Sequence, residues 1–411
     1  MKNNAALARN INLPLLTLYG LGTILGAGIY VLIGKVAGQA GLLAPLAFIV
    51  AAVIAWVTAL SYSQLVILLP LSAGEAYYVD QAFHRKQLTL LVGLLIILTG
   101  IVSAATLANG FIGYLTLFLN IDRAVGILLV VIILAIIACW GISESLIVSG
   151  LITVVEILGI ILVIALNTDT LISLGSNADN IHIADFFLPH SFASLTGIFS
   201  GAFLAFYAFI GFEDMVNVVE EVKEPESTMP KAIILAIILS SLLYVIIALI
   251  AVVAIPVDTL ASSDAPLTLL IQDKSASGTV LLGLIGLFAI INGVLIQMIM
   301  ASRVIYGISQ KSSRLSRLAQ VNSKTQTPVI ATVLVSALII IFALFLPIAT
   351  LAKLTSFIIL IIFTLVHLAL FSIKRKTIIP ESIKTKNYPV LGAVLCLFLL
   401  LFQTALFFSA A

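Results

Sequence analysis

Long apolar runs are the feature that most constrains what this chain can fold into. Stretches of twenty or more residues with few charges recur along its 411 residues. A helix of that length crosses a hydrocarbon core about 30 Å thick. Hydrophobic residues make up 62% of the chain and charged residues 9%, whereas roughly 25% of a soluble domain is charged. The sequence therefore excludes a soluble globular enzyme and predicts an all-α polytopic membrane protein.

The apolar runs, bounded by charges, proline or glycine, predict eleven transmembrane helices. No linker or second domain is visible between them, so we expect one transmembrane domain over residues 1–411. The spans are predicted near 13–38, 43–69, 88–119, 124–141, 146–166, 192–219, 231–255, 279–309, 328–347, 351–373 and 389–409.

The positions of Lys and Arg predict the orientation in the membrane. With the N-terminus in the cytoplasm, sixteen of these cations fall in inner segments and four in outer segments, namely Lys35, Arg123, Lys274 and Lys353. Cytoplasmic loops carry such an excess. We expect a multi-pass protein of an inner or plasma membrane, with its C-terminus outside after eleven spans. The net charge of +2 gives no sign of a nucleic-acid partner, and no pattern indicates an oligomeric state.

Two spans contain a predicted interruption. In the first span, Gly26 and Gly28 flank one small residue, and each glycine weakens a helix interior by about 1 kcal/mol. In the sixth span, apolar residues run up to Gly211, and the acids Glu213 and Asp214 follow. Close helix packing is an alternative explanation for the glycine pair, because small residues let backbones approach.

Five spans separate the two interruptions, so the sixth span enters the membrane from the face opposite to the first. This predicts two inverted repeats, about 13–166 and about 192–373, with an extra helix at about 389–409. Paired interrupted helices in inverted halves indicate a transporter binding site at the bilayer midplane.

The free backbone groups expected at the interruptions suit a zwitterion. N–H groups near Gly28 would attract an anion, whereas carbonyls near Ile24 and at Phe209 and Ile210 would suit a cation. An α-amino acid carries both charges one carbon apart and fits both ends.

Several segments resemble motifs of the amino acid–polyamine–organocation superfamily. The resemblance covers residues 20 to 330 and implies the leucine-transporter-like fold of five plus five inverted helices, with discontinuous helices 1 and 6. Many relatives have twelve spans, one more than predicted here. The matching segments are Gly26–Tyr30, Pro70–Tyr77, Ala205–Phe212, Glu220–Pro225, Ser302–Gly307 and Thr327–Val329.

The resemblance also implies roles for individual residues. The backbone of the first-helix motif would hold the substrate carboxylate, carbonyls of both helices would hold its amine, and side chains of the sixth helix would shape the pocket. The residues for the carboxylate are Ala27 and Gly28, those for the amine are Ile24, Phe209 and Ile210, and those for the pocket are Tyr207, Ala208 and Phe212. Gly26 is also expected in the substrate site.

Glu156 is a lone acid in the fifth span. It lies twelve residues after Glu144 and thirteen before Asp169, about 18 Å from each along a helix and therefore near the bilayer centre. Ionisable residues at this depth serve as proton relays, so we expect Glu156 to couple a proton to substrate movement. A permanently protonated glutamate that bonds a neighbouring helix is the alternative. In several proton-coupled relatives that this chain resembles, the matching helix carries a lysine at about this place, standing in for a coupling sodium ion. Glu156 has the opposite sign, and a carboxylate can carry a proton or bind Na⁺, so the coupling ion stays open.

Four other polar residues are candidates for a gate or for the transport pathway. Glu213 and Asp214 could contact a cationic side chain, or could sit at a wet helix start, where acids are favourable. Asn109 and Asn292 could line the pathway, or could form interhelical hydrogen bonds. The scattered histidines predict no metal site, and no nucleotide-binding loop is present, so no cofactor is expected.

The leading hypothesis is a secondary active transporter that takes up L-amino acids by alternating access, coupled to protons. Small and aromatic residues at the predicted site favour a medium apolar side chain, while the acids leave a cationic amino acid or a polyamine open. The alternatives are an amino acid or polyamine exchanger, and a membrane-embedded amino acid sensor or channel.

Overall fold

The computed structural model describes residues 9–71, 74–140, 146–176, 183–189, 191–310, 315–376 and 388–410. Ser72 and Ala73 of the motif after the second span lie outside these residues, as does Glu144, and the side chain of Ala27 is not described.

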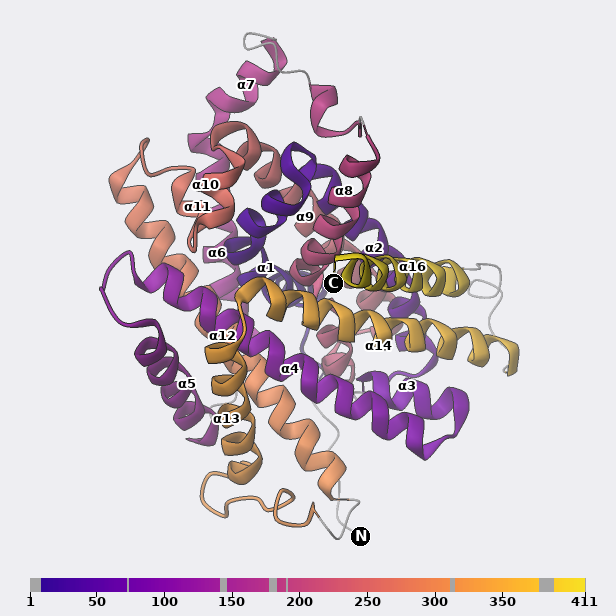
Figure 1. The fold of residues 1–411 in the computed structure, drawn as a ribbon. Helices are drawn as coiled ribbons and strands as arrows, with labels where there is room; N and C mark the ends of the chain where they lie inside the picture. The colour runs from indigo at the N-terminus through magenta and orange to yellow at the C-terminus, as the bar shows by residue number, and fades with distance from the viewer. Residues whose placement is uncertain are drawn as a thin grey trace.

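Membrane-length helices form the described part of the chain (Figure 1). Each predicted span coincides with a helix, or with a broken helix in the sixth case, and the ends agree within six residues. This confirms the all-α polytopic prediction. The spanning helices are α1 (Leu13–Ala40), α2 (Ala44–Leu68), α4 (Lys86–Leu115), α5 (Arg123–Trp140), α6 (Leu146–Leu166), α8 (Phe192–Ala205), α9 (Pro225–Ala254), α12 (Ala276–Ser309), α13 (Val329–Phe345), α14 (Ile348–Lys376) and α16 (Tyr388–Ala410).

Short helices connect the spans at both ends of the bundle. In Figure 1, α7 and α10 lie in the upper part of the view and α3 in the lower part. The connecting elements are η1 (Gly41–Leu43), α3 (Gly74–Phe83), α7 (Thr168–Ser176), η2 (Ile183–Phe186), α10 (Val257–Ser262) and α11 (Pro266–Leu269). Two further short elements, η3 (Phe206–Phe209) and η4 (Phe212–Glu221), belong to the sixth span itself.

The predicted interruption of the first span is wrong for this structure, because α1 is one helix from Leu13 to Ala40. The glycines instead permit close packing, which was the alternative explanation. A Cβ atom at Gly28 would overlap the backbone of Ala208 in the sixth span. The absence of a side chain there lets the two central helices touch.

The predicted interruption of the sixth span is confirmed. The regular helix ends at Ala205, the 3₁₀ segment η3 follows, and Ile210 is extended. Gly211 has φ +128°, a conformation that L side chains rarely adopt, and η4 then continues the span. A Cβ at Gly211 would also overlap the carbonyl of Thr23 on α1. The break therefore needs glycine both for its backbone angle and for its contact with α1.

The broken span is also tied to the start of the chain. The N–H of Ile11 donates to the Glu221 carbonyl at 3.1 Å, and the N–H of Lys223 donates to the Ile11 carbonyl at 2.9 Å. These bonds join the segment before α1 to the end of η4, so the two central spans are held together beyond their packed middle.

Replacing Gly211 by alanine tests the break. We expect Gly211→Ala to destabilise the protein by about 1–3 kcal/mol, because the new Cβ forces a strained backbone against α1. Thermal unfolding in detergent, followed by size-exclusion fluorescence, measures the effect. Gly307→Ala is the matched control, since a Cβ at Gly307 meets nothing within 4 Å. Equal unfolding temperatures for the two variants would contradict the role of Gly211.

Candidate functional site

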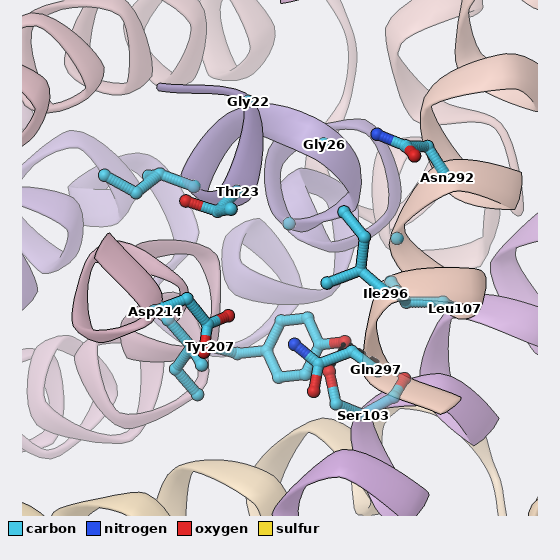
Figure 2. A pocket seen from close by; sticks show the side chains of 14 residues that line it. Gly22, Thr23, Gly26, Ser103, Leu107, Tyr207, Asp214, Asn292, Ile296 and Gln297 are labelled. Carbon is cyan, nitrogen blue, oxygen red and sulfur yellow. Dashed lines mark hydrogen bonds between the residues drawn. The ribbon is translucent and has the colours of Figure 1, made fainter. Parts of the chain in front are cut away.

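A pocket lies where α1 meets the break of the sixth span, enclosed on the other side by α4 and α12 (Figure 2). It combines backbone of α1, apolar side chains and a group of polar side chains from three elements. The residues that line it are Gly22, Thr23, Ile24, Gly26, Gly28, Ser103, Leu107, Tyr207, Ile210, Asp214, Asn292, Gly293, Ile296 and Gln297.

Five of the nine predicted substrate-site residues line this pocket. They are Ile24, Gly26, Gly28, Tyr207 and Ile210. The sequence thus located the pocket through the two glycine-containing segments, although only one of these segments is broken.

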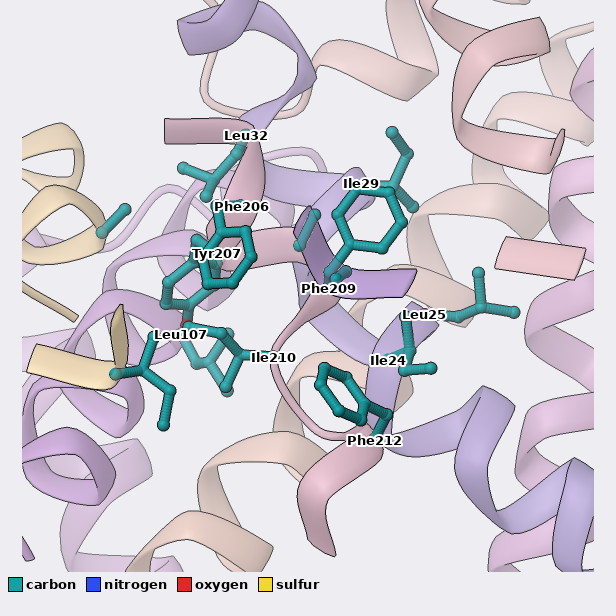
Figure 3. Close-up of a cluster of buried hydrophobic side chains, with 14 of the residues drawn as sticks. Ile24, Leu25, Ile29, Leu32, Leu107, Phe206, Tyr207, Phe209, Ile210 and Phe212 are labelled. Carbon is teal, nitrogen blue, oxygen red and sulfur yellow. The ribbon is translucent and has the colours of Figure 1, made fainter. Parts of the chain in front are cut away.

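Three other sixth-span residues of the predicted site lie behind the pocket. Ala208, Phe209 and Phe212 are buried in a hydrophobic cluster against α1 and are absent from the pocket wall (Figure 3). The Phe212 ring packs against Tyr62 and Phe363, with centroids 5.6 and 5.4 Å away. Ala208 and Phe212, predicted to shape the pocket, and Phe209, predicted to offer its carbonyl, thus lie in the core and not in the pocket wall.

One of the three carbonyls predicted to hold the amine, that of Ile24, is engaged by a tyrosine of α9. The Tyr244 hydroxyl lies 2.8 Å from the Ile24 carbonyl and 2.9 Å from the Ala208 carbonyl. One hydroxyl proton can serve one acceptor at a time, so Tyr244 bridges α1 and the break by two alternative bonds. Nothing in the sequence near Tyr244 pointed to this contact.

Polar groups converge on one wall of the pocket. The Tyr207 and Ser103 hydroxyls lie 3.0 Å apart, and Figure 2 shows Gln297 beside them. The buried Oε1 of Gln297 has no hydrogen-bond partner among the described residues. Asp214 contributes a carboxylate to the same pocket. This wall therefore offers acceptors to a cationic group.

Of the two asparagines considered for the pathway, Asn292 lines the pocket and Asn109 does not. Asn109 donates from Nδ2 to the Ala343 carbonyl at 3.1 Å. Arg123 donates to Asn109 Oδ1, at 2.6 Å from its terminal nitrogen, and to the same Ala343 carbonyl at 3.0 Å. The pathway prediction for Asn109 is thus corrected to the alternative, an interhelical bond that joins α4, α5 and α13.

A second pocket continues from the first toward α3. Asp214, Gln297 and Ile210 line both pockets, while Glu75 and Glu213 line the second alone. It lies at the end of the bundle where α2 finishes and α3 begins. Because the two pockets share these three lining residues, they adjoin and form one route from the central site toward that membrane face, with polar and apolar side chains along it.

The acids of the second pocket are partly satisfied by the protein. Glu213 Oε2 accepts from the Gly211 N–H at 2.8 Å, and Glu75 Oε1 accepts from the Tyr62 hydroxyl at 3.0 Å. Burial raises the pKa of Glu75, while hydrogen bonds from the backbone and from Tyr62 oppose this shift. The Glu75 carboxyl is therefore protonated more readily than one in water.

The opposite end of the bundle is closed by bonds between segments. Lys35 on α1 donates to the carbonyls of Ala261 and Ser263 at 2.7 and 3.2 Å, which holds the α10 segment over α1. At the end of α1, Gln39 Oε1 accepts from the Ser200 hydroxyl of α8 at 2.9 Å. The structure is thus sealed on the side of α7 and α10.

Glu156 is buried, with 1% of its surface exposed, but it does not line either pocket. Its backbone carbonyl accepts from the Tyr30 hydroxyl of α1 at 3.0 Å. Its carboxyl group lies within electrostatic range of the Tyr30 and Tyr244 hydroxyls. Glu156 therefore sits behind α1, next to the tyrosine that bridges α1 to the break.

Comparison with known proteins identifies a family. A family model described as "Amino acid permease" matches residues 11–411. The branched-chain amino acid permease BcaP of Bacillus subtilis (strain 168) is 29% identical, over 94% of this chain and 86% of that protein. BcaP of Lactococcus lactis subsp. cremoris (strain MG1363) is 27% identical, over 91% and 84%. The vacuolar cationic amino acid transporter 2 of Arabidopsis thaliana is 26% identical, over 90% of this chain but 60% of that longer protein.

Removing the Tyr244 hydroxyl tests the bridge between α1 and the break. We expect Tyr244→Phe to lower amino acid uptake at least fivefold, since a buried carbonyl left without its donor costs about 1–3 kcal/mol. Uptake into proteoliposomes measures this, and Tyr77→Phe on α3, outside both pockets, is the control. An unchanged uptake rate in Tyr244→Phe would show that the bridge has no part in transport.

Proposed function

This chain belongs to the amino acid permease family of the amino acid–polyamine–organocation superfamily, as its motifs predicted, and we propose that it takes up apolar L-amino acids together with protons. It is a multi-pass membrane transporter and not an enzyme. The observation that carries the substrate proposal is the pocket between α1 and the broken sixth span, whose lining combines polar and apolar side chains.

The amino acid is proposed to bind with its ammonium group toward Gln297 and Asp214. A buried amide oxygen and a carboxylate are the acceptors that an ammonium needs. The carboxylate would lie toward the glycine-rich turn of α1, from Gly22 to Gly28. Because α1 is helical here, its N–H groups become available only if this segment unwinds on binding. The glycines lower the free-energy cost of such unwinding.

The side chain of the substrate is proposed to be medium-sized and apolar. Leu107, Ile210 and Ile296 line the pocket, and burying a branched aliphatic chain against them contributes about 1.5–3 kcal/mol. The similarity to branched-chain permeases supports this class. A cationic substrate is the second candidate, supported by Asp214 on the pocket wall and by the similarity to cationic amino acid transporters.

Alternating access is proposed to start from the arrangement seen here, closed at Lys35 and Gln39 and leading from the pocket toward Glu75. With the N-terminus in the cytoplasm, the route through the two pockets faces inward and the sealed end faces outward. The C-terminus would then lie outside. In this state the amino acid would leave toward the cytoplasm, and uptake would require the bonds of Lys35 to α10 to open.

Glu156 is proposed to carry the coupled proton. It reaches the site through Tyr244, whose hydroxyl can bond Ile24 or Ala208. A change of charge on Glu156 would favour one orientation of that hydroxyl and so alter the contact between α1 and the break. Proton and substrate movement would be linked through this contact, without a direct bond between Glu156 and the amino acid.

Uptake into proteoliposomes under separate pH and Na⁺ gradients tests the proposed function. We expect L-leucine uptake to rise when the outside is acidic and to be independent of a Na⁺ gradient. Added isoleucine and valine should inhibit this uptake more strongly than added lysine. Glu156→Gln should lose the response to pH but keep counterflow exchange. Glu226→Gln, at an exposed position on α9, is the control and should respond normally.

Each alternative gives a different result in the same assay. Full pH-driven uptake by Glu156→Gln would contradict its coupling role. Counterflow without response to either gradient in the wild type would indicate an exchanger. Saturable binding without flux would indicate a sensor, and non-saturable flux a channel. Stronger competition by lysine would favour the cationic substrate.

A further inference from the structure

A groove between α5 and α13 opens directly toward the bilayer, away from the two pockets of the transport route. Its exposed wall is aliphatic: Ile132 is 48% exposed, Ile136 56% and Val333 56%. At its floor the groove meets α12, because the Ser336 hydroxyl of α13 lies 3.5 Å from the sulfur of Met298 on α12. The same hydroxyl donates to the Thr332 carbonyl of its own helix at 2.8 Å. The residues that line the groove include Ile132, Ile136, Cys139, Val333, Ala337 and Ile340.

The groove runs inward from one membrane–water interface. Thr327, just before α13, donates to the Cys139 carbonyl in the last turn of α5 at 2.8 Å, so both helices meet the interface at the same level. Trp140 follows and is 72% exposed, as is typical of an interfacial aromatic residue. From Cys139 to Ile132 the wall extends about 10 Å into the hydrocarbon region.

Cations lie at the interfacial end of the groove. A tight turn before Thr327 is held by the Asn322 N–H, which donates to the Thr327 carbonyl at 3.0 Å, and by the Lys324 N–H, which donates to Asn322 Oδ1 at 2.9 Å. The turn therefore keeps exposed Lys324 beside Thr327, and exposed Arg317 lies in the same connection. Cations here suit the phosphate of an anionic headgroup.

We propose that this groove binds an anionic phospholipid, with one acyl chain along α5 and α13 and its headgroup at Lys324 and Arg317. The aliphatic wall matches an acyl chain, which needs no hydrogen bond. A peptide strand would leave backbone N–H and C=O groups unsatisfied against the same wall. The lipid would brace two helices that Arg123 already joins at their other ends.

Native mass spectrometry of the full-length protein in mild detergent tests the site. The probes are dioleoyl phosphatidylglycerol and dioleoyl phosphatidylcholine, added at equal concentration. We expect the wild type to retain phosphatidylglycerol preferentially. The double variant Arg317→Gln and Lys324→Gln should weaken its binding about 25-fold, at roughly fivefold for each cation, and leave phosphatidylcholine binding unchanged. Lys86→Gln, an exposed cation at the start of α4, is the control for charge.

Filling the groove separates the acyl-chain contact from the headgroup contact. Ala337→Phe, at an exposed position of α13, should reduce retention of both lipids, whereas Ala405→Leu on the exposed face of α16 should not. Equal retention of the two lipids by the wild type would overturn the proposal. So would unchanged phosphatidylglycerol binding in the double variant, or equal losses in Ala337→Phe and Ala405→Leu. Unfolding temperatures close to that of the wild type verify that each variant is folded.

Discussion

The structure depends on how it satisfies backbone groups that the sixth span frees inside the membrane. Within a hydrocarbon environment an unsatisfied N–H or C=O group costs several kcal/mol. Here the Gly211 N–H is taken by the Glu213 carboxylate, and the Ala208 carbonyl is within reach of the Tyr244 hydroxyl. The same hydroxyl reaches Ile24 on α1. The bonds that make the break tolerable therefore also place it against α1 and so define the pocket.

The few basic side chains at the sealed end each bind a neighbouring segment. All four cations predicted to lie outside make contacts with other segments: Lys35 with the α10 segment, Arg123 with α13, Lys274 with α7, and Lys353 with the end of α1. Opening this end requires some of these contacts to break. The hydrogen bonds among them contribute about 0.5–3 kcal/mol each and the exposed Lys274–Asp169 ion pair roughly 0–1 kcal/mol, which is weak enough for such opening.

Features that depend on local sequence patterns, such as the spans and the break of the sixth span, could be predicted from the sequence. Contacts between residues far apart in the chain could not. Hydropathy placed the spans, and Gly211 with its following acids placed the break. The packing of Gly28 against Ala208, which favours a continuous α1, involves residues far apart in the chain, as does the bridge from Tyr244. Asn109 was assigned to the pathway because a polar residue in a span looks the same whether it faces a pocket or another helix.

The central claim is that the amino acid binds between α1 and the break of the sixth span. A structure of the purified protein with L-leucine bound tests it most directly. The account predicts ligand density between the Gly22–Gly28 stretch and Tyr207, with the ammonium group beside Gln297 and Asp214. Density confined to the second pocket beside Glu75, or an unchanged pocket without density at saturating L-leucine, would contradict it.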